Sequence, residues 1–190
     1  MTLKNTLKSY LISDPKYYGN EIETFSITLT KALIQYSPDY ACFRDKREYS
    51  SKPEFAKLFV EISRRYGISS FLNSDFNLAF ELGYDGVHLP SYMLDKIDIV
   101  KKFGLKIFVS CHDETEIEFC EKIGVDAITL SPVFSSPDKG KPLGVEKFGK
   151  MIENINTKVF ALGGITDSLH IEKIKKSKAY GFASIRYFVD

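Results

Sequence analysis

The sequence predicts an α/β fold, a compact (β/α)8 (TIM) barrel in which residues 1–190 form a single domain. Short apolar runs alternate along the whole chain with longer amphipathic stretches, a pattern typical of parallel strands joined by helices. The short runs are apolar at nearly every position, as strands are when both faces of a sheet are covered. Eight such units favour closure into a barrel, and an open doubly wound sheet is the alternative.

The expected strands are short apolar runs that end at turn-forming residues. Pro15 follows the first run closely and Pro90 stops the fourth, because proline cannot donate to a sheet ladder. In chain order the strands are predicted at 9–12, 40–43, 68–72, 86–89, 106–110, 127–130, 159–162 and 180–185.

Helical periodicity predicts a helix between each pair of strands. Pro53 suits a first helical position, and Leu58, Phe59, Ile62 and Tyr66 then fall on one face at a spacing of 3.6 residues. In chain order the helices are predicted at 20–36, 53–66, 75–82, 93–103, 114–123, 145–155 and 168–177.

The chain ends soon after the eighth predicted strand. A barrel of this class usually has about 250 residues, so this one is pared down and its eighth helix is predicted to be missing. The missing helix would leave an apolar flank with Tyr180, Phe182 or their neighbours exposed. A homodimer that covers this flank is one hypothesis.

Composition excludes several classes of protein. The chain has 26 basic and 25 acidic residues, so we expect no nucleic-acid partner and no anionic-membrane partner, which both need concentrated positive charge. No apolar run approaches the ~20 residues of a membrane helix, and the N-terminus shows no signal-peptide core, so we expect a cytoplasmic location. Cys42, Cys111 and Cys120 have no CxxC spacing and are interpreted as small core residues in a reducing compartment.

A ligand is expected at the C-terminal ends of the strands, where barrels of this class place their sites. Gly163 and Gly164 follow the seventh strand and precede a helix. Their backbone N–H groups and the helix start are predicted to hold a phosphate, with Ser184 and Arg186 completing the site. A simple tight turn is the alternative.

Basic residues also follow different strands. Arg44, Lys46 and Lys139 either converge on one anion, such as pyrophosphate or a carboxylate, or are separate solvated loop charges. Position alone leaves both interpretations open. Further polar candidates at strand ends are Asn73, Ser74, Asp75, Ser91, Ser110, Ser131, Ser136 and Asp138.

Two histidines lie near the expected site. His112 comes just after the fifth strand and is a candidate for moving a proton near neutral pH. His88 lies inside the fourth strand and is interpreted as a structural hydrogen-bonding residue. Cys111 and His112 are not interpreted as a nucleophilic dyad, because adjacent strand residues point to opposite faces.

Four segments together resemble a known family. They are Asp-Gly-Val-His-Leu at 85–89, Val-Ser-Cys-His at 109–112, Ser-Pro-Val-Phe-Ser-Ser-Pro-Asp-Lys at 131–139 and Ala-Leu-Gly-Gly-Ile at 161–165. In this order they resemble the thiamine phosphate synthase superfamily, which also contains the TenI thiazole tautomerases, over nearly the whole chain. The resemblance implies a (β/α)8 barrel. It also implies one of two reactions: the synthase joins a pyrimidine diphosphate to a thiazole phosphate and releases pyrophosphate with Mg²⁺, whereas TenI proteins isomerise a thiazole phosphate carboxylate without a metal.

The resemblance has departures at the positions that bind pyrophosphate and metal. Arg44, Lys46 and Lys139 match the family, while Cys42 replaces a glutamine and Asp138 replaces a hydroxyl residue. Ser74 and Met93 stand where the family has its two Mg²⁺ carboxylates. Mg²⁺ prefers hard oxygen ligands, which a thioether is not. Asp75 lies one residue away from Ser74 and could replace the lost carboxylate after a shift, so the presence of a metal site stays open at this point.

We therefore expect a TenI-like isomerase that needs no cofactor, with His112 as the proton carrier, assisted by Lys46. His88-Leu89-Pro90 is similar to TenI proteins, whereas Pro132 stands where they have a catalytic histidine. One alternative is a thiamine phosphate synthase with a rearranged Mg²⁺ site. Another is a non-catalytic barrel that binds a thiamine-related phosphate or a partner enzyme. In the catalytic cases the partner is a small phosphorylated thiazole or thiamine phosphate.

Overall fold

The strands close into a parallel barrel. The computed structural model describes residues 7–137 and 139–189, and within them each strand pairs with its chain neighbour and β8 pairs with β1. This confirms the predicted barrel over the open sheet. The strands are β1 (Lys8–Ile12), β2 (Tyr40–Phe43), β3 (Ser69–Asn73), β4 (Gly86–Leu89), β5 (Lys106–Cys111), β6 (Ala127–Leu130), β7 (Lys158–Leu162) and β8 (Gly181–Ser184).

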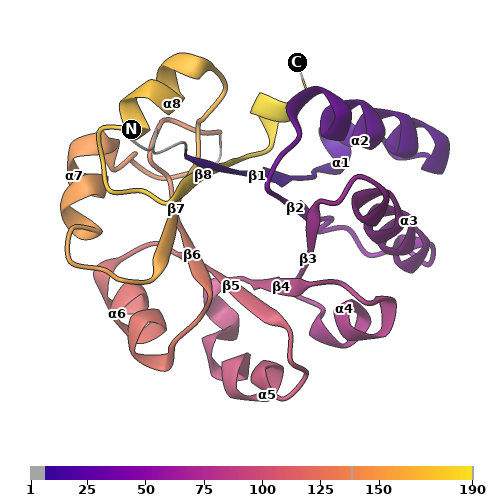
Figure 1. The fold of residues 1–190 in the computed structure, drawn as a ribbon, viewed down its shortest axis with the longest axis horizontal. Helices are drawn as coiled ribbons and strands as arrows, with labels where there is room; N and C mark the ends of the chain where they lie inside the picture. Colours follow the sequence, from indigo (N-terminus) through magenta and orange to yellow (C-terminus); the bar gives the residue numbers. More distant parts are fainter. Residues whose placement is uncertain (1–6, 138, 190) are drawn as a thin grey trace, which may run out of the picture.

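The helices form a ring outside the strands (Figure 1). They are α1 (Pro15–Tyr18), α2 (Ile22–Tyr36), α3 (Lys52–Arg65), α4 (Phe76–Leu82), α5 (Ile97–Lys101), α6 (Glu114–Ile123), α7 (Gly144–Met151) and α8 (Ser168–Ile174), with 3₁₀ helices η1 (Ser91–Lys96) and η2 (Arg186–Phe188). Asp75, Asp113 and Asp167 fix the starts of three helices, because each side chain accepts a hydrogen bond from the backbone N–H three residues later. The single helix expected at 93–103 is divided into η1 and α5, and α1 was not expected.

Aromatic rings fill the interior of the barrel. Tyr10, Phe71, Phe108 and Phe160 are almost fully buried there, and the rings of Phe71 and Phe108 lie 4.1 Å apart between centroids. Gly86 in β4 makes room for this layer, because a Cβ there would lie 2.4 Å from the ring of Phe71. The interior below the strand ends is therefore a packed core, and a ligand can enter only above it.

Within the described residues, the element that follows β8 is the 3₁₀ helix η2. The expected exposed flank is wrong. Phe182 is only 5% exposed because Phe188 of η2 stacks on it at 5.9 Å between ring centroids. Tyr180 belongs to the barrel interior, where its ring contacts that of Phe160 at 5.4 Å. One turn of aromatic 3₁₀ helix thus covers Phe182, and the homodimer hypothesis loses the observation on which it rested.

The cysteines are free and buried, as expected of core residues. The Sγ atoms of Cys111 and Cys120 lie 3.7 Å apart where α6 packs on β5. Within residues 7–137 and 139–189, none of the helices combines the length and the apolar character that crossing a membrane requires.

Candidate active site

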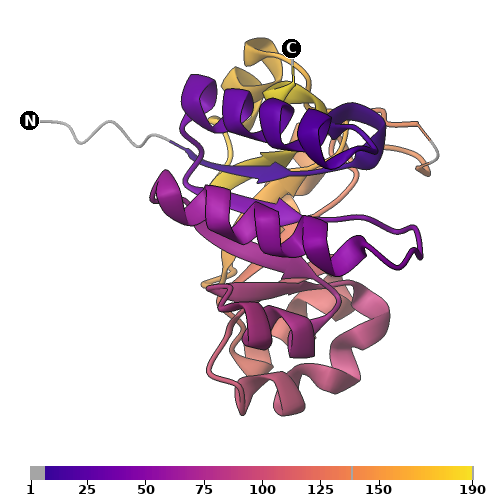
Figure 2. The same ribbon diagram turned by 90° about the vertical axis from the view of Figure 1, so that its right-hand side faces the viewer.

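A cavity of about 1040 Å³ lies at the C-terminal ends of the strands. The loops after β2 and β6 extend on this side of the barrel (Figure 2). The cavity brings together the candidates that the sequence indicated at strand ends, apart from Asp138, which lies outside the described residues. Its lining includes Arg44, Lys46, Asn73, Ser74, Asp75, Ser110, His112, Ser136, Lys139, Gly163, Gly164, Ser184 and Arg186.

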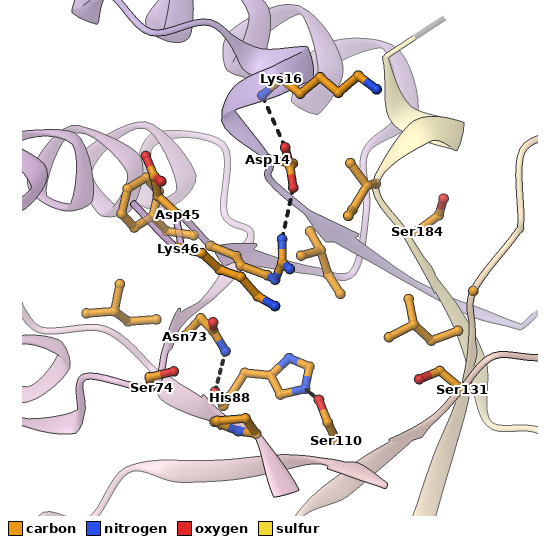
Figure 3. Close-up of a pocket in the computed structure, with 18 of the residues that line it drawn as sticks. Asp14, Lys16, Asp45, Lys46, Asn73, Ser74, His88, Ser110, Ser131 and Ser184 are labelled. Atoms are coloured by element: carbon orange, nitrogen blue, oxygen red, sulfur yellow. Dashed lines mark hydrogen bonds and ion pairs between the residues drawn. The ribbon is translucent and has the colours of Figure 1, made fainter. Parts of the chain in front are cut away.

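One side of the cavity is lined by cations from two loops. Arg44 follows β2, where its Nη1 donates to Asp14 Oδ2 at 2.9 Å and its backbone N–H donates to Ser13 Oγ at 3.0 Å. The positive charge of Arg44, followed by burial and the charge of Lys139, lowers the pKa of Lys46. Arg44 and Lys139 thus lie near enough to Lys46 for their charges to act on it, and an anion bound among the three would relieve that repulsion. Figure 3 shows Lys46 directed into the cavity below Asp14.

His88 forms the floor of the cavity. It is 3% exposed, and its Nδ1 and Nε2 lie 3.0 Å from Tyr10 Oη and 3.0 Å from Ser110 Oγ. Burial, followed by the charge of Arg44, lowers the pKa of His88 to about 3. The ring is therefore neutral near pH 7, and both of its nitrogens are occupied. It orients Ser110 rather than exchanging a proton with a ligand.

The backbone of His88 also holds the loop after β3. Its carbonyl oxygen accepts hydrogen bonds from Asn73 Nδ2 at 2.8 Å and from the backbone N–H of Ser74 at 3.0 Å. Ser74 has a φ of +69°, an unusual conformation for a residue with a side chain. Asn73 and Ser74 lie beside His88 on the cavity wall (Figure 3). Among the described residues, none donates a hydrogen bond to the amide oxygen of Asn73.

His112 lies exposed at the rim of the same cavity. Its Nδ1 is 3.1 Å from the carbonyl oxygen of Ser131, so Nδ1 carries the proton and donates it. In the neutral ring Nε2 is then the basic nitrogen. This geometry makes His112 able to accept a proton from a molecule in the cavity.

Gly163 and Gly164 lie on another side of the cavity, in conformations with φ of +96° and +71°. A Cβ on Gly163 would lie 2.8 Å from Pro132 Cα, and one on Gly164 would lie 2.4 Å from the carbonyl oxygen of Ser135. Both glycines are therefore required for packing against the loop after β6, whether or not a ligand binds. The interpretation of Gly163 and Gly164 as a tight turn therefore accounts for their conformation and their packing.

Two supporting arguments for a phosphate at these glycines are corrected by the structure. The helix that follows, α8, begins at Ser168, and the side chain of Asp167 already caps its N-terminus by accepting from the backbone N–H of His170. Ser184 Oγ donates to the carbonyl oxygen of Ile165 at 2.7 Å and so organises the loop after β7. The remaining donors are the backbone N–H groups of the turn and the side chain of Arg186.

The family's metal positions do not form a magnesium site. Met93 packs against the hydrophobic core and does not line the cavity. Asp75 uses Oδ1 to cap α4, through the backbone N–H of Leu78 at 3.0 Å, and Asp14 is paired with Arg44. Within the described part of the chain, no three His, Cys, Asp or Glu side chains gather as a metal site. The residues present thus lack the pair of carboxylates that the family resemblance implies for Mg²⁺.

Sequence reasoning missed two groups that shape the site, the carboxylate of Asp14 and the backbone carbonyl of Ser131, although Ser131 itself was among the candidates at strand ends. Asp14 orients Arg44, and Ser131 sets the proton position on His112. Asp14 follows β1 closely, so the rule that ligands lie at strand ends would have included it. The carbonyl of Ser131 had no sequence signal, because a backbone oxygen is present at every residue.

Comparisons of the sequence with known proteins show one family, and a comparison with solved structures shows the fold. The thiamine monophosphate synthase (TMP-TENI) model matches residues 9–188. An Aquifex aeolicus protein named "Putative thiamine-phosphate synthase 2" is 34% identical over 189 residues, which cover 95% of this chain and 97% of that protein. The Lactococcus lactis thiamine-phosphate synthase is 27% identical over 176 residues, covering 85% and 80%. The solved Pyrococcus furiosus thiamine phosphate pyrophosphorylase has a TM-score of 0.81 and 24% identity, covers 95% of this chain and 86% of that one, and shares the fold.

Proposed function

Because the chain belongs to the thiamine monophosphate synthase family, we propose that it joins a pyrimidine diphosphate to a thiazole phosphate and releases pyrophosphate. The observation that carries this proposal is a single cavity with two sides suited to anions. One side holds Arg44, Lys46 and Lys139, and the other holds the turn at Gly163 and Gly164. β2, which leads to Arg44 and Lys46, is separated around the barrel by β1 and β8 from β7, which leads to the glycine turn, while Lys139 comes from the loop after β6, next to β7. Two separate anionic groups are what a two-substrate reaction of this class requires.

The cation side is assigned to the diphosphate. When the bond to the diphosphate breaks, negative charge grows on the departing oxygen, and fixed positive groups stabilise that charge. The guanidinium of Arg44 offers a planar fork for two phosphate oxygens, while Lys46 and Lys139 act as point charges. The lowered pKa of Lys46 supports the assignment, because it reports cations that repel one another until an anion binds.

The glycine turn is assigned to the phosphate of the thiazole. Backbone N–H groups of Gly163 and Gly164 would donate to phosphate oxygens, which a side chain at these positions would obstruct. Arg186 lines the cavity and adds a positive charge. This side needs no metal, since a single phosphate is satisfied by a few donors and one cation.

We assign no step to Mg²⁺, because Ser74 and Met93 replace the carboxylates that the family resemblance implies. In this proposal the three cations neutralise the leaving group. The dependence of the reaction on Mg²⁺ is therefore a measured quantity in the test below.

A thiazole tautomerase is the second candidate function, and the geometry of His112 favours it. Nδ1 of His112 is committed to the carbonyl of Ser131, so Nε2 is the basic atom available to a ligand in the cavity. Lys46, with its lowered pKa, is the second group able to move a proton there. This reaction would use one phosphate site and one proton carrier.

One experiment separates the functions. The purified protein is mixed with the pyrimidine diphosphate and the thiazole phosphate, with and without Mg²⁺, and thiamine phosphate and pyrophosphate are quantified. Equal amounts of both products, lost in Lys139→Met, support the synthase. A parallel sample receives the non-aromatic thiazole phosphate carboxylate, and aromatisation that His112→Ala abolishes supports the tautomerase instead. Binding without turnover in both samples refutes both and leaves a binding protein.

A further inference from the structure

The loop between β2 and α3 carries two of the cavity's cations with a carboxylate between them. Arg44, Asp45 and Lys46 all line the cavity, but the carboxylate of Asp45 is directed away from Lys46, and its side chain is 3% exposed (Figure 3). A buried carboxylate next to two functional cations requires an explanation, because an unpaired buried charge is strongly unfavourable.

Asp45 is fully occupied by partners on its own loop. Oδ1 accepts hydrogen bonds from the backbone N–H of Arg47 at 2.9 Å and from its Nε at 3.0 Å. Oδ2 accepts from Arg47 Nη2 at 2.7 Å and from Tyr49 Oη at 2.8 Å. Burial alone would raise the pKa of Asp45, but these hydrogen bonds outweigh it and lower the pKa below its usual value. The group is therefore an ionised carboxylate that closes the loop on itself.

Arg47 and Tyr49 fasten this closed loop to the rest of the barrel. Arg47 Nη1 donates to Asn20 Oδ1 at 2.6 Å, which ties the loop to the segment between α1 and α2. The ring of Tyr49 packs edge-on against Phe55 of α3 at 5.8 Å between centroids. The loop is thus attached on both of its sides, and Arg47 is absent from the residues that line the cavity.

We propose that Asp45 is a positioning residue: through Arg47 and Tyr49 it holds the loop so that Lys46 stays beside Arg44 on the cation side of the cavity. Asp45 also binds Arg47 and keeps this further cation out of the cavity. The inference deepens the proposed function, because it concerns the site assigned to the diphosphate. Its test uses binding and titration and does not need turnover.

Substitution of Asp45 separates two explanations, because they predict opposite changes in the affinity for anions. If Asp45 acted only through its charge, Asp45→Asn would remove a negative group near the cations and tighten anion binding. If Asp45 positions the loop, the same substitution weakens binding of inorganic pyrophosphate in calorimetry by about tenfold or more, the range for one lost charged hydrogen bond. Binding that is unchanged or tighter overturns the proposal.

Lys46 gives a second readout that requires no ligand. Asp45→Asn should raise the pKa of Lys46 toward its ordinary value, because the released loop lets Lys46 move away from Arg44. Loss of the carboxylate charge alone would lower that pKa instead. The titration is followed by NMR of the protein with ¹³C-methylated lysines, assigned with Lys46→Arg. A pKa that stays the same or falls contradicts the proposal even if pyrophosphate does not bind.

Glu48→Gln is the matched control, since it makes the same change of charge on the same loop. Glu48 also lines the cavity, but its side chain is 91% exposed and pairs with Lys52, so loss of its negative charge should leave pyrophosphate binding unchanged or slightly tighter. Tyr49→Phe keeps every charge and removes one hydrogen bond to Asp45, and it should weaken binding in the same direction as Asp45→Asn but less. Thiazole phosphate binding should stay unchanged in all three variants, which separates a local loop effect from unfolding.

Discussion

The buried His88 predicts a loss of stability in mild acid that can be worked out from the structure. Its pKa falls from 6.5 to about 3 on folding because the ring is buried among Tyr10, Ser110 and the barrel core. Between these two pH values the unfolded chain binds a proton that the folded chain does not, so stability falls as the pH falls below about 6.5. Each unit of pH costs about 1.4 kcal/mol, and lowering the pH from 7 to 4.5 should remove about 2.5 kcal/mol.

The assay is urea unfolding of the wild type and of His88→Gln at both pH values. Glutamine retains hydrogen-bonding capacity but does not titrate, and the contributions of other groups cancel in the difference between the two proteins. The variant is expected to be less stable at pH 7, and the gap should shrink by about 2.5 kcal/mol at pH 4.5. In melting temperature this is about 5–10 °C for a chain of this size. A gap that is the same at both pH values would refute a neutral, buried His88.

Three further predictions concern packing and loop contacts. Gly164→Ala should destabilise the protein by about 2 kcal/mol in urea unfolding, since its Cβ would meet backbone and its φ is +71°; wild-type stability would contradict the packing role. Phe188→Ala should cost about 3–4 kcal/mol in the same assay and increase dye binding at the uncovered Phe182, and a small cost with no dye signal would contradict the role of η2. Glu121, whose pKa the hydrogen bond from Thr157 Oγ1 chiefly lowers to about 2, contributes stability that is lost as the pH falls from 4.5 toward 2. Glu121→Gln should therefore show a smaller loss over that interval, and parallel curves would count against it.

The barrel was predictable because its strands are buried on both faces and so appear as unbroken apolar runs. The predicted bounds of 40–43, 86–89 and 127–130 match β2, β4 and β6. The end of the chain was not predictable in the same way. Two aromatic residues of the three-residue 3₁₀ helix η2 cover β8. Helical periodicity is recognised only over several turns of sequence, so it cannot predict an element of three residues.

Most of the candidate site was predictable from one rule, that barrels of this class place ligands at the C-terminal ends of strands. The rule predicted that Arg44, Asn73 and Lys139 lie at one site although they are far apart in sequence, and all three line the cavity. It could not say what each side chain does. Ser184 reaches the cavity, but its hydroxyl is engaged by Ile165, and such a contact depends on a loop path that a single sequence does not indicate.

The electrostatics of the cavity argue that its cations and its missing carboxylate are linked. A carboxylate at position 74, which lines the cavity, would repel a diphosphate, and a divalent cation would then be needed between the two negative groups. With serine there, that source of repulsion is absent. Arg44, Lys46 and Lys139 can then face a diphosphate directly, and the Asp45–Arg47 pair keeps the loop that carries two of them in place. An anion site of this kind depends on the geometry of one loop, so changes to that loop should alter diphosphate binding before they alter the barrel.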